Sequence, residues 1–170
     1  GSHAMPENNV LLKVDNLVKH FPVLQGVFQR QVGAVHAVDG INFAVERGEI
    51  FGLLGPNGAG KTSTLECLEG LRRADGGALD ILGVDPTRQP RKLRNLIGVQ
   101  LQTSGLPADM QVDEAVRFFC VYHDVAPRHD LIERLGLETK RREKYGKLST
   151  GQQRRLALAL AVAHKPPVLF

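Results

Sequence analysis

The sequence predicts an α/β fold, and three observations support this. Near the N-terminus apolar residues alternate with polar ones, which is typical of antiparallel strands with one solvated face. A short apolar run, a glycine-rich loop and a helical pattern then follow one another between residues 49 and 71. From Thr103 the pattern is helical until an apolar run begins at Val168. With 170 residues, 42% of them hydrophobic, the chain can bury the core of one domain.

Each element is predicted from its local periodicity. A polar insert at 22–36, PVLQGVFQRQVGAVH, is expected to separate the first two strands, and RADGG is expected to be a turn. In chain order, the expected elements are strands at 10–14, 41–45 and 49–55, a helix with Leu65, Leu68 and Leu71 on its apolar face, strands at 79–82 and 95–102, helices at 113–122, 131–135 and 150–164, and a strand from Val168.

Composition excludes several classes of protein. The net charge of +4 and the basic run at 140–144 could favour nucleic acid, but aromatic residues make up only 5%, so no nucleic-acid partner is expected. The longest apolar run, 156–163, is shorter than the ~18 to 20 residues of a membrane span. Residues 1–5, GSHAM, resemble a purification-tag remnant and are left out of the fold prediction.

The cysteines and histidines show no pattern typical of a disulfide or a metal site. Cys67 and Cys120 lie far apart in apolar helical surroundings, and are expected to be buried reduced thiols. None of the histidines beyond the tag has metal-ligand spacing, so solvated or capping roles are expected for His20, His36, His123, His129 and His164.

The segment Gly55–Thr62, GPNGAGKT, has the spacing G-x-x-x-x-G-K-[ST] of a phosphate-binding loop and stands between an apolar run and a helix. Its glycines allow backbone N–H groups to turn inward around a triphosphate, and the helix adds its positive N-terminus. Lys61 supplies a charge to the β and γ phosphates, and the Thr62 hydroxyl can bind magnesium. The expected nucleotide-binding residues are Gly55, Pro56, Asn57, Gly58, Ala59, Gly60, Lys61, Thr62 and Ser63.

A second motif, LSTGQQ, precedes the last helix. Ser149 and Gln152 have the S-x-x-Q spacing of a capping box, so one interpretation is only a well-capped helix. The backbone at Thr150 and Gly151 also presents N–H groups at a helix N-terminus, which makes a second potential anion site. The residues of this motif are Leu148, Ser149, Thr150, Gly151 and Gln152.

With both motifs in this order, the sequence resembles the ATP-binding subunit of an ABC transporter. LSTGQ resembles the family's signature LSGGQ, with Thr150 in place of the first glycine. The resemblance implies that Gln102 faces magnesium together with Thr62, with Gln100 a weaker candidate. It also implies that Phe21 stacks on adenine, although Phe21 could instead be a plain core residue.

The family's fold is a P-loop NTPase of ABC type, and the resemblance implies its subdivision here. The β subdomain and the first part of a RecA-like core would cover 6–102, the helical subdomain 103–152, and the signature helix with the start of the Walker B strand 153–170. The C-terminal part of the core would be missing. In this fold a strand from beyond Phe170 lies between 50–54 and Val168, so its absence would leave a slot in the sheet, filled by strand exchange or closed differently.

The resemblance also implies a mechanism and partners. Two copies would meet head to tail, so that Ser149 and Gly151 of one copy face the ATP bound at Lys61 of the other. An integral membrane permease would be driven from the cytoplasmic face of the membrane. The family's catalytic Asp and Glu would follow Phe170, so no catalytic residue is expected within 170 residues and this chain is expected to bind nucleotide at most. Asp80 and Asp85 are surface-loop residues without a motif.

The transported substrate is left open. The segments GPNGAGKTSTLECLEGL and IGVQLQTSGLPADM resemble subunits that export drugs, antibiotics or lipids, whereas the insert before AVDG resembles oligopeptide importers. Export is the prediction. A soluble ABC ATPase without a membrane partner and a purely regulatory nucleotide-binding module are the alternatives from other classes.

Overall fold

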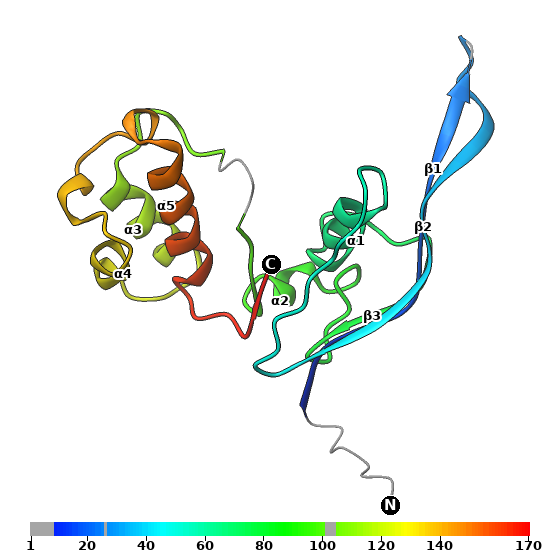
Figure 1. The fold of residues 1–170 in the computed structure, drawn as a ribbon, viewed down its shortest axis with the longest axis horizontal. Helices are drawn as coiled ribbons and strands as arrows, with labels where there is room; N and C mark the ends of the chain where they lie inside the picture. The colour runs from blue at the N-terminus through cyan, green and yellow to red at the C-terminus, as the bar shows by residue number, and fades with distance from the viewer. Residues whose placement is uncertain (1–8, 26, 101–104) are drawn as a thin grey trace, which may run out of the picture. The chain divides into compact units, whose positions relative to one another are not determined.

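The computed structural model describes residues 9–25, 27–100 and 105–170. The chain divides into two compact units, Gly1–Arg94 and Asn95–Phe170 (Figure 1). The predicted magnesium ligand Gln102 lies outside the described residues, as does the expected boundary at 102/103.

The first unit is built on a long antiparallel hairpin. β1 (Val10–Gln25) pairs with β2 (Arg30–Glu46), and β3 (Gly76–Ile81) pairs with the first half of β1, so the sheet has the order β2-β1-β3 (Figure 1). The helices α1 (Lys61–Leu68) and α2 (Pro90–Leu93) belong to this unit. Its buried apolar residues include Leu12, Val14, Leu17, Val38, Cys67, Leu68, Leu79, Ile81 and Leu93. The predicted α/β class and the antiparallel pairing of 10–14 with 41–45 are confirmed.

The polar insert predicted at 22–36 is wrong as a separator of strands. β1 continues to Gln25 and β2 already begins at Arg30, so most of the insert is itself hairpin. The physical reason is that valines at 23, 32 and 35 favour extended backbone, while antiparallel strands need only a short connection.

The strand predicted at 49–55 is absent from the structure. Ile50 is 99% exposed and Leu54 95% exposed, and no described residue pairs with this segment in a ladder. An apolar run becomes a strand only where a neighbouring strand takes up its backbone hydrogen bonds. Leu71 was also wrongly placed on the helix, because α1 ends at Leu68 and Leu71 is exposed.

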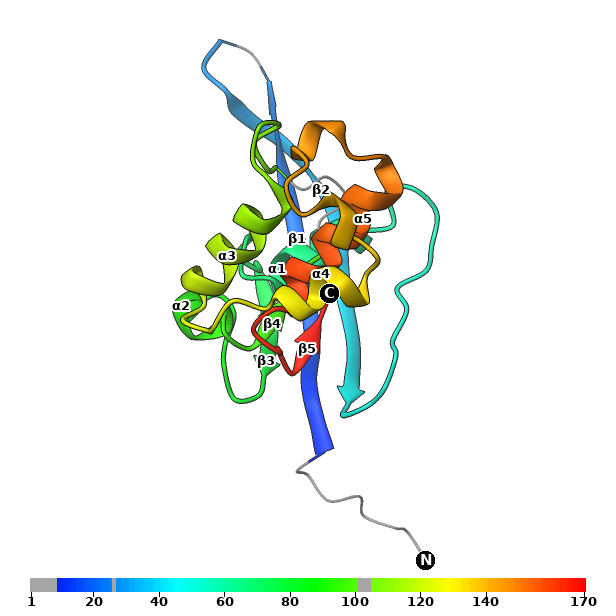
Figure 2. The ribbon, with the colours of Figure 1, turned by 90° about the vertical axis from the view of Figure 1, so that its left-hand side faces the viewer.

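The second unit is a helical cluster joined to a two-stranded parallel sheet. The helices are α3 (Val112–Tyr122), α4 (His129–Arg134) and α5 (Thr150–Val162), with 3₁₀ turns η2 (Glu138–Lys140) and η3 (Tyr145–Lys147). The three helices were predicted within a few residues. β4 (Ile97–Gly98) runs parallel to β5 (Val168–Leu169), as the two labelled strands show in Figure 2.

The core of this unit is tightly packed. A Cβ on Gly98 would overlap the carbonyl of Ala161, so α5 packs against β4 at the distance that only glycine allows. The buried cluster consists of Val112, Ala115, Val116, Cys120, Leu131, Ile132, Leu137, Leu148, Leu156, Ala159, Leu160 and Ala163. Cys120 here and Cys67 in the first unit are both buried and free, as the sequence predicts.

Candidate functional site

The glycine-rich loop turns sharply just before α1. Gly58 and Gly60 have φ of +85° and +79°, the left-handed region that side chains rarely adopt. A Cβ on Gly60 would also overlap the carbonyl oxygen of Ala37 on β2. Gly60 therefore has two independent reasons to be glycine, and it fixes the loop's end against the hairpin.

The uncapped N-terminus of α1 and the Lys61 ammonium both place positive charge at the start of the helix. No side chain caps the helix, and the Thr64 hydroxyl donates to the Gly60 carbonyl at 2.9 Å, so it does not accept a bond from a first-turn N–H. The Lys61 ammonium donates to the carbonyls of Gly55 and Pro56, each at 2.7 Å. The Lys61 side chain thus folds back across the preceding loop, where its ammonium contacts only neutral acceptors.

Thr62 and Ser63 follow Lys61 in the first turn of α1. Thr62 is exposed, so its hydroxyl oxygen is accessible next to the Lys61 charge, whereas Ser63 is half-buried. An accessible hydroxyl at this position suits magnesium, which prefers oxygen ligands and retains several waters. The chain thus fits a magnesium ion bound through one protein oxygen and substrate phosphates.

Phe21 is half-buried on β1 and does not belong to the buried core. Two cations face its ring: Arg72 Cζ lies 4.9 Å and Lys19 Nζ 5.4 Å from the ring centroid. Sequence reasoning missed both cations, although Lys19 stands only two residues before Phe21; for Arg72, only the fold brings the segment after α1 beside β1. The ring is therefore a partly accessible aromatic platform flanked by two cations, each of which is ion-paired, Arg72 with Glu66 and Lys19 with Asp75.

Asp75 is the partner that positions Lys19. It accepts a hydrogen bond from the His20 N–H at 2.8 Å and an ion pair from Lys19 at 3.0 Å. The His20 N–H first, and then Lys19, hold the pKa of Asp75 below its ordinary value. Asp75 therefore remains ionised and keeps Lys19 beside Phe21.

β2 links the loop to Phe21 within the first unit. Ala37 touches Gly60, and Val35, two residues earlier, pairs with Phe21 across the hairpin. The structure thus places the predicted phosphate loop and the predicted adenine platform on one continuous framework.

The signature motif lies in the second unit, at the start of α5. Ser149 Oγ accepts a bond from the Gln152 N–H at 3.3 Å, and Gln152 Oε1 accepts one from the Ser149 N–H at 2.9 Å, so the predicted capping box is present. Leu148 is buried, while Thr150 and Gly151 are exposed. Within the described residues no acceptor meets the N–H groups of Thr150 and Gly151, and these donors remain available to an anion.

No helix in the part of the chain that the structure describes is both long and apolar enough to cross a membrane.

Comparisons with known proteins show the family of the chain. A model of the ABC transporter family matches residues 38–170. The Nod factor export ATP-binding protein I of Burkholderia thailandensis is 41% identical over 138 residues, which are 78% of this chain and 45% of that protein. The probable multidrug ABC transporter ATP-binding protein YbhF of Escherichia coli is 36% identical over 147 residues, which are 83% of this chain and 25% of that protein. The chain spans about half the length, or less, of these curated relatives.

Two solved structures show the same fold. The ATP binding subunit of an ABC transporter has a TM-score of 0.77 at 24% identity, covering 94% of this chain and 64% of that one. The protein cbiO1 from Clostridium perfringens, described as part of the ABC transporter complex cbiONQ, has a TM-score of 0.74 at 26% identity, covering 95% and 64%. The P-loop NTPase fold predicted for the chain is therefore confirmed.

Proposed function

Because the chain belongs to the ABC transporter family, as part of an ATP-binding domain, we propose that it holds ATP and magnesium in the motor of a membrane transporter. The observation that carries the proposal is the uncapped start of α1, where Lys61 lies across the loop carbonyls of Gly55 and Pro56. An ammonium with only neutral acceptors gains a stronger partner when phosphate oxygens arrive.

Different residues of the first unit contact the phosphates, the magnesium ion and the adenine. Lys61 leaves the loop carbonyls and contacts the β and γ phosphates, while the N–H groups of the loop and of the first turn of α1 surround them. Thr62 contributes one oxygen to magnesium, which when bound neutralises the phosphate charge, and Gln102 is proposed as a second ligand. Phe21 stacks on adenine beside Lys19 and Arg72.

The second unit supplies a site for the ATP of another copy. The capping box fixes Ser149 and Gln152 on each other, which leaves the N–H groups of Thr150 and Gly151 directed at an incoming anion. One such terminus and one phosphate loop per chain support a head-to-tail pair, with two nucleotides held between two copies.

We propose that the complete protein exports its substrate, with a permease as partner at the cytoplasmic face of the membrane. The support is the similarity to proteins described as a Nod factor exporter subunit and a probable multidrug transporter subunit. An oligopeptide importer and a soluble ABC ATPase are the alternatives. Copurification of the full-length protein with an integral membrane protein would exclude the soluble alternative.

Calorimetry with ATP and magnesium tests the site itself. Lys61→Ala should weaken ATP binding at least tenfold, about 1.4 kcal/mol, because a charge-assisted contact is lost. Lys13→Ala, which removes an exposed lysine of β1 outside the loop, is the matched control and should bind ATP like the wild type. Equal affinity of Lys61→Ala and wild type would overturn the assignment of the loop.

Hydrolysis is expected of the full-length protein and not of residues 1–170. The carboxylates that order magnesium and activate water in the family would follow Phe170, and each such group typically contributes ~10² to 10⁴ in rate. Phosphate release by the 170-residue chain should equal that of its Lys61→Ala variant. Turnover of about 1 per second by the short chain would show that the catalytic groups lie within it.

A further inference from the structure

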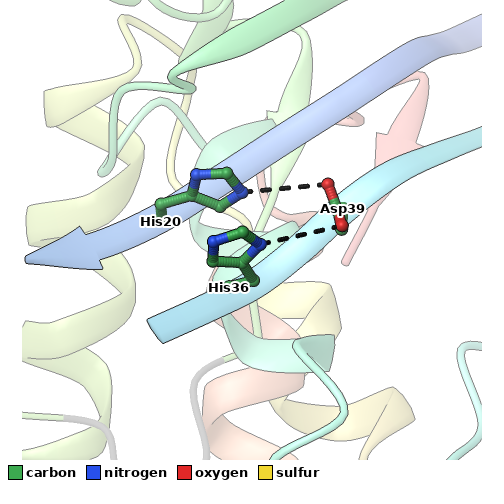
Figure 3. Close-up of side chains that lie close together, drawn as sticks. All are labelled: His20, His36 and Asp39. Atoms are coloured by element: carbon green, nitrogen blue, oxygen red, sulfur yellow. Dashed lines mark ion pairs between the residues drawn. The ribbon is translucent and has the colours of Figure 1, made fainter. Parts of the chain in front are cut away.

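Three polar side chains meet on the β1–β2 hairpin although they are separated in the sequence. Figure 3 shows His20 on β1 and His36 and Asp39 on β2, with both rings facing the Asp39 carboxylate. His20 is the direct cross-strand partner of His36. The sequence shows no metal-ligand spacing among the histidines, because it is the hairpin register that brings His20 beside His36.

The three ligand atoms are spaced nearly as closely as in a coordination site. His20 Nε2 lies 3.8 Å from Asp39 Oδ1, and His36 Nδ1 lies 3.8 Å from Asp39 Oδ2. One ligand atom from each of the three residues lies within 4.8 Å of the others. Two ligands of a tetrahedral zinc ion are roughly 3.3 Å apart, given metal–ligand distances near 2.0 to 2.1 Å. The two rings stack with centroids 3.8 Å apart and planes 17° apart, so one ring must turn about χ2, whose wells are broad, before both nitrogens point at one ion.

The three groups have no stronger partner. His20 Nε2 is buried and has no hydrogen-bond partner among the described residues, since 3.8 Å to Asp39 is too long for one. In that same part of the chain, Asp39 forms ion pairs with the two histidines and with no lysine or arginine. The side chains of His36 and Asp39 are 57% and 71% exposed, so water can complete a coordination shell.

The local backbone gives such an ion a structural role. Pairing between β1 and β3 ends at Val18 and Gly76, so from His20 onward the hairpin has only two strands. The register also shifts between Lys19 and His20. A two-stranded ribbon is marginally stable by itself, and a cross-link at its base would fix both register and direction.

We propose that His20, His36 and Asp39 bind a divalent transition-metal ion of the zinc class, which cross-links β1 to β2. Two imidazole nitrogens select Zn²⁺, Ni²⁺ or Cu²⁺ over Mg²⁺ and Ca²⁺, which prefer all-oxygen shells. The site is separate from the proposed magnesium site at Thr62, because it uses a different ligand chemistry and different residues. Its ion would hold the hairpin beside Phe21 and Ala37 without touching nucleotide.

The test titrates ZnCl₂ into the full-length protein without residues 1–5, so that His3 does not contribute, in buffer free of chelators and nucleotide. We expect one Zn²⁺ per chain by calorimetry, unaffected by millimolar Mg²⁺. His36→Ala and Asp39→Asn should each weaken this binding at least about tenfold, as expected for loss of one of three ligands. His129→Gln, which removes an imidazole of the second unit, is the matched control and should bind like the wild type.

A second measurement needs no variant and therefore does not depend on variants folding. Long-range ¹H–¹⁵N spectra of the histidines should show Zn²⁺ shifting His20 Nε2 and His36 Nδ1, and hydrogen exchange of the hairpin amides should slow. Selective shifts of these two nitrogens support the site. Zn²⁺ binding that survives His36→Ala and Asp39→Asn, shifts confined to other histidines, or no stoichiometric binding would each overturn it.

Discussion

The helical cluster of the second unit buries most of its apolar side chains, whereas segment 47–60 of the first unit leaves most of its apolar side chains exposed. Leu156 and Ile132 are completely buried, whereas Ile50 and Leu54 are almost completely exposed. Helices satisfy their backbone hydrogen bonds internally, so α3, α4 and α5 need only bury their apolar faces against one another. An apolar run of strand type needs a neighbouring strand as well, and none of the described residues supplies one.

This comparison predicts its largest effect for a pair of leucine truncations in the 170-residue chain. Leu156→Ala should lower the free energy of unfolding by about 2 to 5 kcal/mol, because it opens a cavity in the buried cluster. Leu54→Ala should change it by less than about 0.5 kcal/mol, as is usual for an exposed position. Urea unfolding followed by circular dichroism measures both. Similar losses for the two variants would show that Leu54 is buried in solution.

The same two truncations can be made in the full-length protein. If 50–54 pairs there with a strand from beyond residue 170, Leu54→Ala should cost about 2 kcal/mol or more in that context, while the cost of Leu156→Ala stays unchanged. Sedimentation of the 170-residue chain tells whether a second copy supplies the missing pairing: association that Leu54→Ala weakens would indicate strand exchange.

The same contrast explains how much of the fold the sequence predicted. Periodicity located α3, α4 and α5 because a helix depends mainly on its own residues. It failed at 22–36 and at 49–55, where the outcome depends on which strands are neighbours. Pairing is a tertiary property, and local composition does not determine it.

The features of the candidate site also fall into those that the sequence predicts and those that only the fold brings together. The loop glycines, Lys61 and the Ser149–Gln152 box could be found from spacing, because each motif is continuous in the chain. The approach of Arg72 to Phe21, and the meeting of His20 with His36, are brought about by the path after α1 and by the hairpin register. A hairpin interpretation of 22–36 would have aligned the two histidines.

A smaller effect is expected at the loop's contact with the hairpin. Gly60→Ala should lower the free energy of unfolding by about 2 to 3 kcal/mol, because it combines left-handed backbone strain with overlap at the Ala37 carbonyl. Gly58→Ala is the matched control: its φ is also positive, but a Cβ there meets open space, so only about 1 kcal/mol of strain is expected. Equal losses would mean that the packing of Gly60 on β2 contributes nothing.

The smallest expected effect concerns His164. It tests whether the end of α5 is as inaccessible to water as the burial of this ring implies. Burial lowers the pKa of His164, opposed by the hydrogen bond between its Nε2 and the Ile97 carbonyl at 3.0 Å, and the ring stacks on His123 at 3.8 Å. In the unfolded chain His164 takes up a proton below its ordinary pKa of 6.5, whereas in the folded chain it does so only at a lower pH. Stability should be complete above that pH and should fall as the pH drops, by at most about 1.4 kcal/mol per pH unit for this one group.

Urea unfolding of the wild type and of His164→Gln at pH 7.5, 6.5 and 5.5 isolates this contribution. Desolvation raises the pKa of Asp113, but Arg141 and His129 outweigh it and hold that pKa below its ordinary value, so Asp113 stays ionised across this range. Carboxylates common to both proteins cancel in the difference between them. The difference in unfolding free energy between wild type and His164→Gln should therefore shrink toward pH 5.5. A difference that is constant with pH would show that water reaches His164, and that the second unit opens at the end of α5 where the structure has it closed.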